Sequence, residues 1–340
     1  MHQSPEIPLP LLVTGVAGVS GYGAFRYFHA AYGDQVVGMR QEDNWPLSGP
    51  RIVACNAEDP VALARLFEEH RFAEVLNCAG NCALKKCEFD PAMAWRINVD
   101  GVNNLIDVIS RQRQTVRLLH LSIDLVFSGK RGGSYRETDS PDPVTQYGKS
   151  MVVAEQAVQA RLPDATILRI SLPMGVSFNG HAGAIDWIQS RFQKNKPATL
   201  YYDEVRTPTY TDCLNGVFAK LLTRELPGIY HAGGPRRLSL YQIAQVVNRV
   251  GGYDPELLQG CYRRDAGPMP PRAGNVTMDS SRLIAALDHN PFSPWPLNEE
   301  FVPTDPDWHS SRSDGFTGSP ELLHRVLYRN PAKTMAESRC

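Results

Sequence analysis

The chain has 340 residues, of which 42% are hydrophobic and 21% charged, and its formal net charge at pH 7 is −1. This composition is typical of a globular protein long enough for one large or two ordinary domains. The near-zero charge gives no reason to expect nucleic-acid binding, and no apolar run approaches the ~18 residues of a membrane helix.

Seven cysteines are present, at positions 55, 78, 82, 87, 213, 261 and 340. Residues 1–15 lack the basic region and long apolar core of a signal peptide, and an odd cysteine count then predicts reduced thiols in the cytoplasm. Cys78, Cys82 and Cys87 lie close together, but no histidine or fourth ligand stands nearby at zinc-finger spacing. We therefore predict no metal site, and interpret these thiols as small residues at a strand end and loop.

In chain order, the first half alternates short apolar runs with helical patterns. The pattern predicts a strand at 9–15, a helix at 21–33, strands at 35–39 and 51–56, a helix at 59–70, a strand at 73–80, a helix at 93–112, a strand at 117–127, a helix at 146–162 and a strand at 166–175. Asp59 and Pro60 are expected to start the second helix. Strands rich in Val, Ile and Leu that alternate with helices predict a parallel sheet covered on both faces.

The second half is less regular. It predicts helices at 184–195, 211–226 and 238–252, a strand at 228–234, and a last short helix at 321–330. From about Asn290 the composition shifts to Pro, Ser, Asp and Trp, and the periodicity weakens. An ordered arm and a mobile tail both remain open for this segment.

The segment TGVAGVSG, residues 14–21, follows the first predicted strand and opens the first helix. Gly15 permits the tight turn, Gly18 lets the backbone approach a pyrophosphate, and Gly21 lets the helix pack on the strand. Phosphate oxygens would then lie at the helix N-terminus, beside Val19 and Ser20. This context predicts dinucleotide binding; the alternative is an ordinary glycine-rich turn.

The second predicted strand ends at Arg40, where an acidic residue would bind the hydroxyls of the adenosine ribose. The nearest carboxylates are Glu42 and Asp43. An arginine suits a 2′-phosphate by its charge and its bidentate geometry, which favours NADP(H), with NAD(H) as the alternative. The remaining interpretation of Arg40 is a solvated surface side chain.

The glycine segment, LNCAG at 76–80, SIDLVFSG at 122–129 and QYGKS at 146–150 together resemble the extended short-chain dehydrogenase/reductases. Within them the chain is most similar to dTDP-4-dehydrorhamnose reductases and to the regulatory β subunit of methionine adenosyltransferase. VRTPTYTDCL at 205–214, GIYHAGGPRRLSLYQIA at 228–244 and PPRAGNVTMDSSRL at 270–283 resemble segments of that family's substrate domain.

The resemblance, over about residues 10–295, implies an α/β fold with a doubly wound parallel sheet, a Rossmann domain, at 8–174. A smaller C-terminal part, mainly 175–295, would bind the substrate, while 206–228 would pack back on the Rossmann domain. Residues 296–340 would form an extension.

By position, the resemblance also assigns site residues. Most belong to the cofactor site: Gly15, Gly18 and Gly21 at the pyrophosphate, Asn56 at the adenine, Cys78, Ala79 and Gly80 along the cofactor, Asn98 behind the site, Leu172 near the nicotinamide, and Ser122 at the end of the fifth strand. Tyr147 matches the catalytic tyrosine and also belongs to the cofactor site.

Ketone reduction by this family needs a proton for the developing alkoxide, and the family's tyrosine supplies it. A lysine four residues later lowers the tyrosine pKa, and a Ser or Thr on the fifth strand stabilises the charge on the oxygen. Here Met151 holds the lysine position and Ile123 the hydroxyl position. Lys149 lies roughly 200° around the helix from Tyr147 and is a poor substitute. The sequence therefore predicts that the standard reaction is slow.

Lys85, Asp124, His181 and Arg206 are the candidates for substrate contact, each with a plain structural alternative such as a solvated loop. By resemblance the substrate is a nucleotide-activated 4-keto sugar. The leading prediction is an NADP(H)-dependent reductase with an atypical catalytic site. The alternative is an NADP(H)-binding regulatory or scaffold protein, with the segment after Asn290 as an arm for a protein partner. A homodimer is left open.

Overall fold

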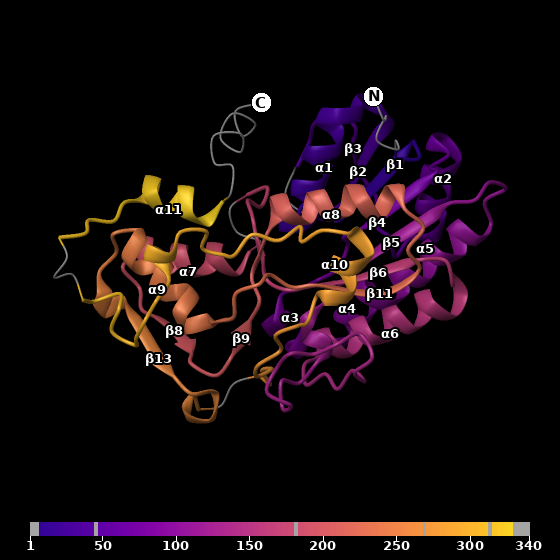
Figure 1. Cartoon of the computed structure of the whole chain (residues 1–340). Coiled ribbons are helices and arrows are strands. Elements are labelled where there is room, and N and C mark those ends of the chain that lie inside the picture. Colours follow the sequence, from indigo (N-terminus) through magenta and orange to yellow (C-terminus); the bar gives the residue numbers. More distant parts are fainter. Residues whose placement is uncertain (1–6, 44–46, 180–182, 268–269, 312–314, 329–340) are drawn as a thin grey trace.

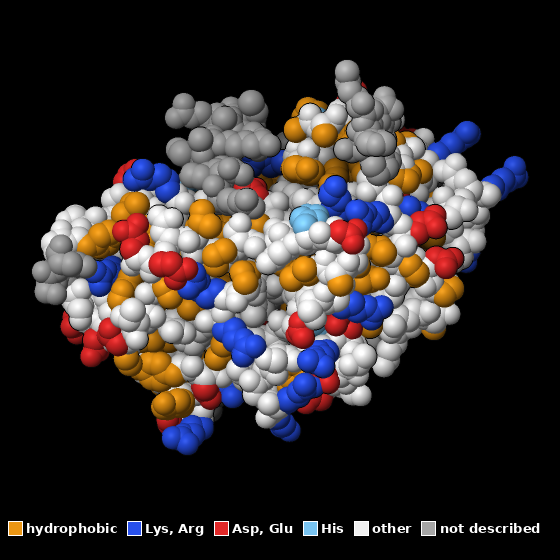
Figure 2. All heavy atoms as spheres, in the orientation of Figure 1, with side chains coloured by type: hydrophobic (Ala, Val, Ile, Leu, Met, Phe, Trp, Pro, Cys, Tyr) orange, Lys and Arg blue, Asp and Glu red, His pale blue; other side chains and the backbone are white. Residues whose placement is uncertain are grey.

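A computed structural model of the chain describes residues 7–43, 47–179, 183–267, 270–311 and 315–328. A larger part contains the central sheet, and a smaller part is built around α9 (Leu240–Val250) beside it (Figure 1). Acidic and basic side chains are interspersed over the face drawn in Figure 2, so that face has no extended patch of one charge. In the described part of the chain, no helix is long and apolar enough to cross a membrane.

The larger part is a seven-stranded sheet in the order β11-β6-β5-β4-β1-β2-β3, with every neighbouring pair parallel. Its strands are β1 (Leu11–Thr14), β2 (Val36–Arg40), β3 (Ile52–Ala54), β4 (Glu74–Asn77), β5 (Arg117–Ile123), β6 (Thr166–Ile170) and β11 (Gly228–Ala232). This is the doubly wound order with one strand added at an edge. The predicted fold class is therefore confirmed, and the strand predicted at 228–234 is the added edge strand.

Each buried strand serves two cores, because successive side chains point to opposite faces of a sheet. Leu12 of β1 packs in the core under one group of helices, α2 (Pro60–His70), α5 (Gly101–Ser110) and α6 (Gln146–Arg161). Leu11 and Val13 pack in the core under the other group, α1 (Val19–Tyr32) and α8 (Thr211–Thr223). The second core continues without interruption into the smaller part.

The sequence predicts where the helices start, but it does not predict that the helix expected at 93–112 is divided. Asp59 Oδ1 accepts the N–H groups of Val61 at 2.9 Å and Ala62 at 3.0 Å, so α2 begins as predicted. The single helix predicted at 93–112 is in fact α4 (Pro91–Trp95), a π-helical turn (Arg96–Asp100) and α5. The stretch interpreted as a loop around Lys85 is a short helix, α3 (Leu84–Phe89), which ends where Pro91 forces Asp90 out of helical geometry.

The smaller part contains α7 (Ala184–Gln193), α9, α11 (Pro320–Leu327) and pairs of short strands, whereas α10 (Ser281–Leu287) packs against β11 at the edge of the central sheet (Figure 1). The pairs are β8 (Ala198–Tyr201) with β13 (Leu258–Cys261), β9 (Val205–Arg206) with β12 (Leu238–Ser239), and β7 (Pro173–Met174) with β10 (Thr209–Tyr210). None of these pairs was predicted, because two to four residues carry no readable periodicity.

Residues 289–311 and 315–328 pack as an ordered arm along α9 and α8. Trp295 is fully buried, and its indole N–H donates to the Leu327 carbonyl at 3.4 Å. The Tyr210 hydroxyl accepts the Leu297 N–H at 3.0 Å and donates to the Val326 carbonyl at 3.3 Å. The arm therefore joins the smaller part at two places that are distant in its own sequence.

Replacement of Trp295 by alanine should lower the free energy of unfolding by about 3–5 kcal/mol, because it leaves a cavity under the arm. Trp187 is the control, since its side chain is 51% exposed and Trp187→Ala should cost less than about 1 kcal/mol. Urea unfolding of both variants checks this. Equal losses in the two variants would mean that the arm does not contribute to the folded core.

Candidate functional site

The glycine loop lies between the carboxyl end of β1 and the start of α1. Gly15 has a φ of +66°, and a Cβ atom there would collide with the Cys78 carbonyl. A Cβ on Gly21 would collide with the Gly15 carbonyl, whereas a Cβ on Gly18 would have ordinary contacts only, 3.5 Å from that oxygen. Backbone packing therefore requires glycine at positions 15 and 21, whereas Gly18 leaves space beside the N-terminus of α1.

Val19 and Ser20 are the first two residues of α1. Backbone N–H groups in the first turn of a helix have no acceptor within the helix, and the helix dipole adds partial positive charge there. The loop can thus offer donors to an anionic group over Gly18, which is the geometry a pyrophosphate needs.

A cavity of about 310 Å³ lies beside the carboxyl ends of β2 and β3. It is lined by Gln41, Asp43, Asn56, Glu58, Asp59, Arg96 and Ile97. Arg40 is not among the lining residues. Its guanidinium donates to the backbone carbonyls of Leu47 at 2.6 Å, Gln41 at 3.0 Å and Glu42 at 3.2 Å. The sequence-based preference for NADP(H) requires the Arg40 guanidinium to face a 2′-phosphate. In the structure this guanidinium instead binds backbone carbonyls of the loop after β2.

This cavity carries negative charge. Glu58 accepts a hydrogen bond from the Gln41 amide at 3.3 Å through Oε1, while its Oε2 is buried without a hydrogen-bond partner among the described atoms. Burial, together with smaller effects of Asp59, Glu42 and Glu58, raises the pKa of the nearby Cys55 thiol to about 11. A buried acceptor in a negative field suits a hydroxyl donor and repels a phosphate.

Buried side chains join the carboxyl ends of β1 and β4 to the middle of β5. Thr14 Oγ1 donates to Asn77 Oδ1 at 2.5 Å, and the Asn77 amide donates to His120 Nδ1 at 2.9 Å. Burial lowers the pKa of His120 to about 4, so its imidazole is neutral at pH 7. The Ala79 N–H donates back to Thr14 Oγ1 at 3.1 Å, which fixes the loop of Cys78, Ala79 and Gly80 over the sheet edge.

Asn98 connects that loop to the start of α6. It lies in the π-helical turn, where its Oδ1 accepts the Asn81 N–H at 2.7 Å. Its amide donates to Ser150 Oγ at 2.9 Å, and Ser150 Oγ donates to the Tyr147 carbonyl at 2.8 Å. Asn98 therefore lies behind the loop and fixes the helix turn that carries Tyr147.

Tyr147 lies in the first turn of α6, with its side chain 7% exposed. Met151, one turn later, is 4% exposed and belongs to the same apolar cluster, against which Ile123 packs from the end of β5. Burial raises the pKa of Tyr147 well above its ordinary range, and Cys82, Asp124 and Cys87 raise it further. None of the groups that shift this pKa is a cation, so the phenol stays protonated at neutral pH.

A buried ionic chain crosses from the sheet to the smaller part. Asp124 accepts Ser171 Oγ–H at 2.6 Å and pairs with Arg206 at 3.1 Å. Arg206 also pairs with Glu204 at 2.8 Å, and Glu204 pairs with Arg272 at 2.6 Å. Burial raises the pKa of Asp124, although Arg206 and Ser171 pull it down. The two carboxylates, of Asp124 and Glu204, thus balance the two guanidiniums, of Arg206 and Arg272, and this row of ion pairs carries no net charge.

The remaining predicted residues are not all brought together. Lys85 is exposed on α3, with its ammonium 5.8 Å from the Phe89 ring centre, and His181 lies outside the described residues. Leu172 is half-buried after β6, and the Ser122 hydroxyl is buried without a hydrogen-bond partner among the described atoms. Within the described residues, no three His, Cys, Asp or Glu side chains are grouped as a metal site.

Sequence reasoning missed several residues that shape this region: Asn77, His120, Glu58, Glu204 and Arg272. Asn77 lies within the quoted LNCAG motif, and Glu204 lies two residues before Arg206. Polar residues at the ends of strands were a usable signal in both cases.

The sequence matches the family described as the RmlD substrate binding domain over residues 10–296. The chain belongs to this family. Among curated relatives, a probable low-salt glycan biosynthesis reductase from Haloferax volcanii is 26% identical, over 81% of this chain and 91% of its own length. A dTDP-4-dehydrorhamnose reductase from Mycolicibacterium smegmatis is 30% identical, over 65% and 67%. The methionine adenosyltransferase 2 subunit beta of Xenopus laevis is 26% identical, over 80% of each chain.

Solved structures agree with this RmlD-family fold. A dTDP-4-dehydrorhamnose reductase from Bacillus anthracis in complex with NADP has a TM-score of 0.71 at 18% identity, covering 93% of this chain and 98% of its own. A dTDP-glucose 4,6-dehydratase from Streptomyces venezuelae with NAD bound has a TM-score of 0.74 at 19% identity, covering 96% and 98%. RmlD-like members are extended short-chain dehydrogenase/reductases, a group of NAD(P)-dependent oxidoreductases.

His120 should make this RmlD-family protein sensitive to acid. Its folded pKa of about 4 lies below the ordinary 6.5, so between these values the unfolded state binds a proton that the folded state does not. The free energy of unfolding should therefore fall as the pH falls, by up to about 1.4 kcal/mol per pH unit from this group. His120→Gln, which keeps an acceptor for Asn77, should flatten that slope in urea titrations, whereas His289→Gln on the surface should not.

Proposed function

We propose that the chain is an NAD(P)(H)-dependent reductase of a nucleotide-activated 4-keto sugar, in which Tyr147 donates a proton without its usual partners. The proposal rests on the family and on the position of Tyr147, which Asn98 and Ser150 fix at the start of α6. The bound nicotinamide would supply the hydride. The residues of the chain would orient the ketone and deliver the proton.

The observation that carries this proposal is the protonation of Tyr147. Its apolar, anion-facing surroundings keep the phenol neutral, so it can donate a hydrogen bond to a ketone oxygen and then a proton to the alkoxide. Donation leaves a tyrosinate, which the same surroundings destabilise until a proton returns from solvent. The raised pKa therefore slows proton transfer in both directions of the reaction.

Ile123 and Met151 should limit the rate. A missing oxyanion donor alone costs about 10²–10³ in rate, and the missing lysine adds to this. In a single-turnover assay with reduced cofactor and a dTDP-4-keto-6-deoxy sugar, Ile123→Thr/Met151→Lys should oxidise the cofactor at least about 100-fold faster than wild type. Nicotinamide fluorescence follows the reaction, and near-ultraviolet circular dichroism checks that the buried lysine is tolerated.

Tyr147→Phe in both backgrounds is the control, and it should abolish turnover in each. A wild-type rate equal to that of the double variant would contradict the role given to Ile123 and Met151. A bound cofactor with no turnover in either protein would contradict the sugar substrate.

For the cofactor, the adenosine cavity favours NAD(H) over NADP(H), the reverse of the preference drawn from Arg40 in the sequence. The unpartnered Glu58 Oε2 can accept a ribose hydroxyl, while a 2′-phosphate would meet Asp43, Glu58 and Asp59. Arg96 is the basic residue in the lining, and Arg40 is bonded to backbone carbonyls.

Wild-type protein should bind NADH more tightly than NADPH, and Glu58→Gln should tighten NADPH about fivefold by removing one charge near the phosphate. Glu68→Gln, at an exposed position of α2, which begins two residues after Glu58, is the matched control and should change neither affinity. Fluorescence titration of the three proteins with NADH and NADPH gives the six dissociation constants. If the wild type bound NADPH more tightly than NADH, and Glu58→Gln left both affinities unchanged, the cavity would not determine the choice of cofactor.

A second candidate function has specific support. The apolar pair Ile123 and Met151 removes the family's proton relay, and relatives of similar identity include methionine adenosyltransferase 2 subunit beta proteins. In that case the chain binds NAD(P)(H) and regulates a protein partner. Cofactor binding without turnover in the single-turnover assay, in wild type and double variant alike, would favour this function.

A further inference from the structure

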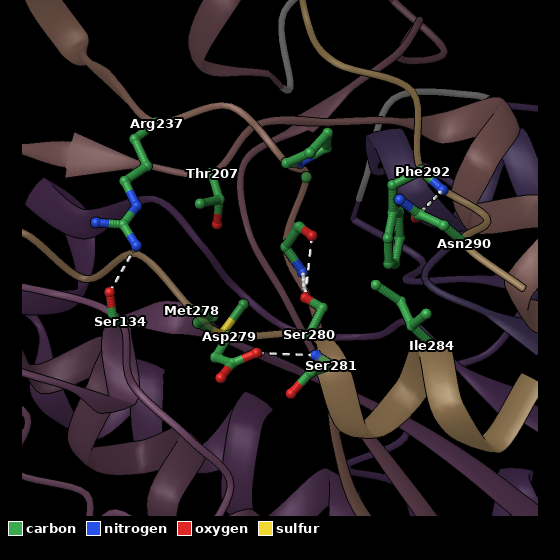
Figure 3. A pocket seen from close by; sticks show the side chains of 13 residues that line it. Ser134, Thr207, Arg237, Met278, Asp279, Ser280, Ser281, Ile284, Asn290 and Phe292 are labelled. Atoms are coloured by element: carbon green, nitrogen blue, oxygen red, sulfur yellow. Dashed lines mark hydrogen bonds between the residues drawn. The ribbon is translucent and has the colours of Figure 1, made fainter.

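A second cavity, of about 280 Å³, lies at the edge of the sheet beyond β11, and shares no residue with the predicted cofactor or catalytic site. Three chain segments surround it, as Figure 3 shows. The loop after β11 contributes Gly233, Gly234, Pro235 and Arg237, and the arm contributes Asn290 and Phe292. The start of α10 and the three residues before it contribute Met278, Asp279, Ser280, Ser281 and Ile284. Ser134 and Thr207 complete the wall.

Ser134 has a strained backbone at this cavity. Its φ is +55°, a left-handed conformation that costs a non-glycine residue free energy, although the chain uses glycine at the two preceding positions. The Ser134 hydroxyl accepts a hydrogen bond from Arg237 Nη2 at 2.6 Å. The strained residue therefore carries the side chain that orients the guanidinium.

Thr207 is the second unfavourable feature on the same wall. Its residue is 2% exposed, and its Oγ1 has no hydrogen-bond partner among the described atoms. Figure 3 shows this hydroxyl directed between Arg237 and the start of α10. A buried hydroxyl without a partner destabilises the folded chain, so its presence calls for an explanation.

Arg237 and Asp279 are the charged residues in the cavity lining, and Arg136 offsets the Asp279 carboxylate, which leaves the positive charge of Arg237. Asp279 accepts the Ser281 N–H at 2.9 Å and pairs with Arg136 at 3.4 Å. Arg237 donates one N–H to Ser134, and a guanidinium has five. Ile284 and Phe292 give the cavity an apolar side away from Arg237 (Figure 3).

We propose that this cavity binds a small organic anion, with a carboxylate or phosphate on Arg237, Ser134 and Thr207 and an apolar body against Phe292 and Ile284. A strained serine and an unpartnered hydroxyl facing one cavity mark a site that is completed by a ligand. At about 30 Å³ for each water-sized group, the volume accommodates roughly nine non-hydrogen atoms. This site is independent of the proposed reductase reaction.

The test uses full-length protein saturated with NADH, so that the cofactor cleft is occupied, and titrates two anions by calorimetry. Benzoate represents a carboxylate on a ring, and glycerol 3-phosphate represents a phosphate on an aliphatic body. Benzamide, which has the shape of benzoate without its charge, is the ligand control. We expect saturable binding of at least one anion and none of benzamide, and the stronger anion identifies the preferred group.

Arg237→Gln should weaken that binding about tenfold or more, because it removes a charge-assisted hydrogen bond. Arg236→Gln is the matched control, since Arg236 pairs with Glu299 at 2.6 Å and does not line the cavity. Equal weakening by the two variants would mean attraction to surface charge, and absence of saturable binding by either anion would overturn the proposal.

Thr207→Val separates a ligand site from a structural role. The valine keeps the shape and removes the unpartnered hydroxyl, so the melting temperature without ligand should rise by about 2 °C while anion affinity falls. A fall in melting temperature with unchanged affinity would show that the hydroxyl serves folding and would contradict its place in the site.

Discussion

The hydrogen bonds from Thr14 through Asn77 to His120 join the carboxyl ends of β1 and β4 to the middle of β5. These polar atoms are buried in an otherwise apolar sheet, where an unpaired group would cost about 1–3 kcal/mol. The glycine loop and the loop of Cys78 to Gly80 begin at the ends of β1 and β4, and β5 ends three residues after His120, at Ile123. A shift of one strand would therefore displace the glycine loop and the surroundings of Tyr147 together.

The molecule has the fold of the RmlD family, and the surroundings of Tyr147 are apolar. Met151 and Ile123 pack in one cluster with Tyr147, at positions to which the family resemblance assigns a lysine and a hydroxyl, and burial raises the pKa of the phenol. Towards the smaller part, the guanidiniums of Arg206 and Arg272 are neutralised by buried carboxylates. Asn98 and Ser150 fix the helix turn that carries Tyr147.

The sequence predicts those features of the fold that depend on interactions between residues close together in the chain. Runs of Val, Ile and Leu separated by helices predict the parallel sheet, and Asp59 and Pro60 predict the start of α2, because these signals act over a few residues. The short helix α3 was missed, since six residues do not complete two turns of periodic pattern. The structure gives the positions of the residues proposed for catalysis and cofactor binding, and their contacts with ligands stay predictions.

Side-chain direction was the part that the sequence could not supply. Arg40 stands where an arginine could meet a 2′-phosphate, but its orientation depends on the Leu47 carbonyl across a loop. The unpartnered oxygens of Glu58 and Thr207 were equally hidden, because a missing partner is a property of the whole neighbourhood. Residue type indicates which chemistry is available, and the packing decides where it points.

Arg206 and Thr207 are consecutive, yet they face different places: Arg206 pairs with Asp124 in the buried ionic chain, and Thr207 lines the second cavity. The Thr207 N–H donates to Ser171 Oγ at 3.1 Å, and that hydroxyl donates to Asp124. A movement of this strand is therefore shared between Asp124, which raises the Tyr147 pKa, and the cavity wall. Thermodynamic linkage makes such coupling reciprocal. If a ligand in the second cavity changes the affinity of a ligand beside Tyr147 by some factor, the ligand beside Tyr147 changes the affinity of the cavity ligand by the same factor.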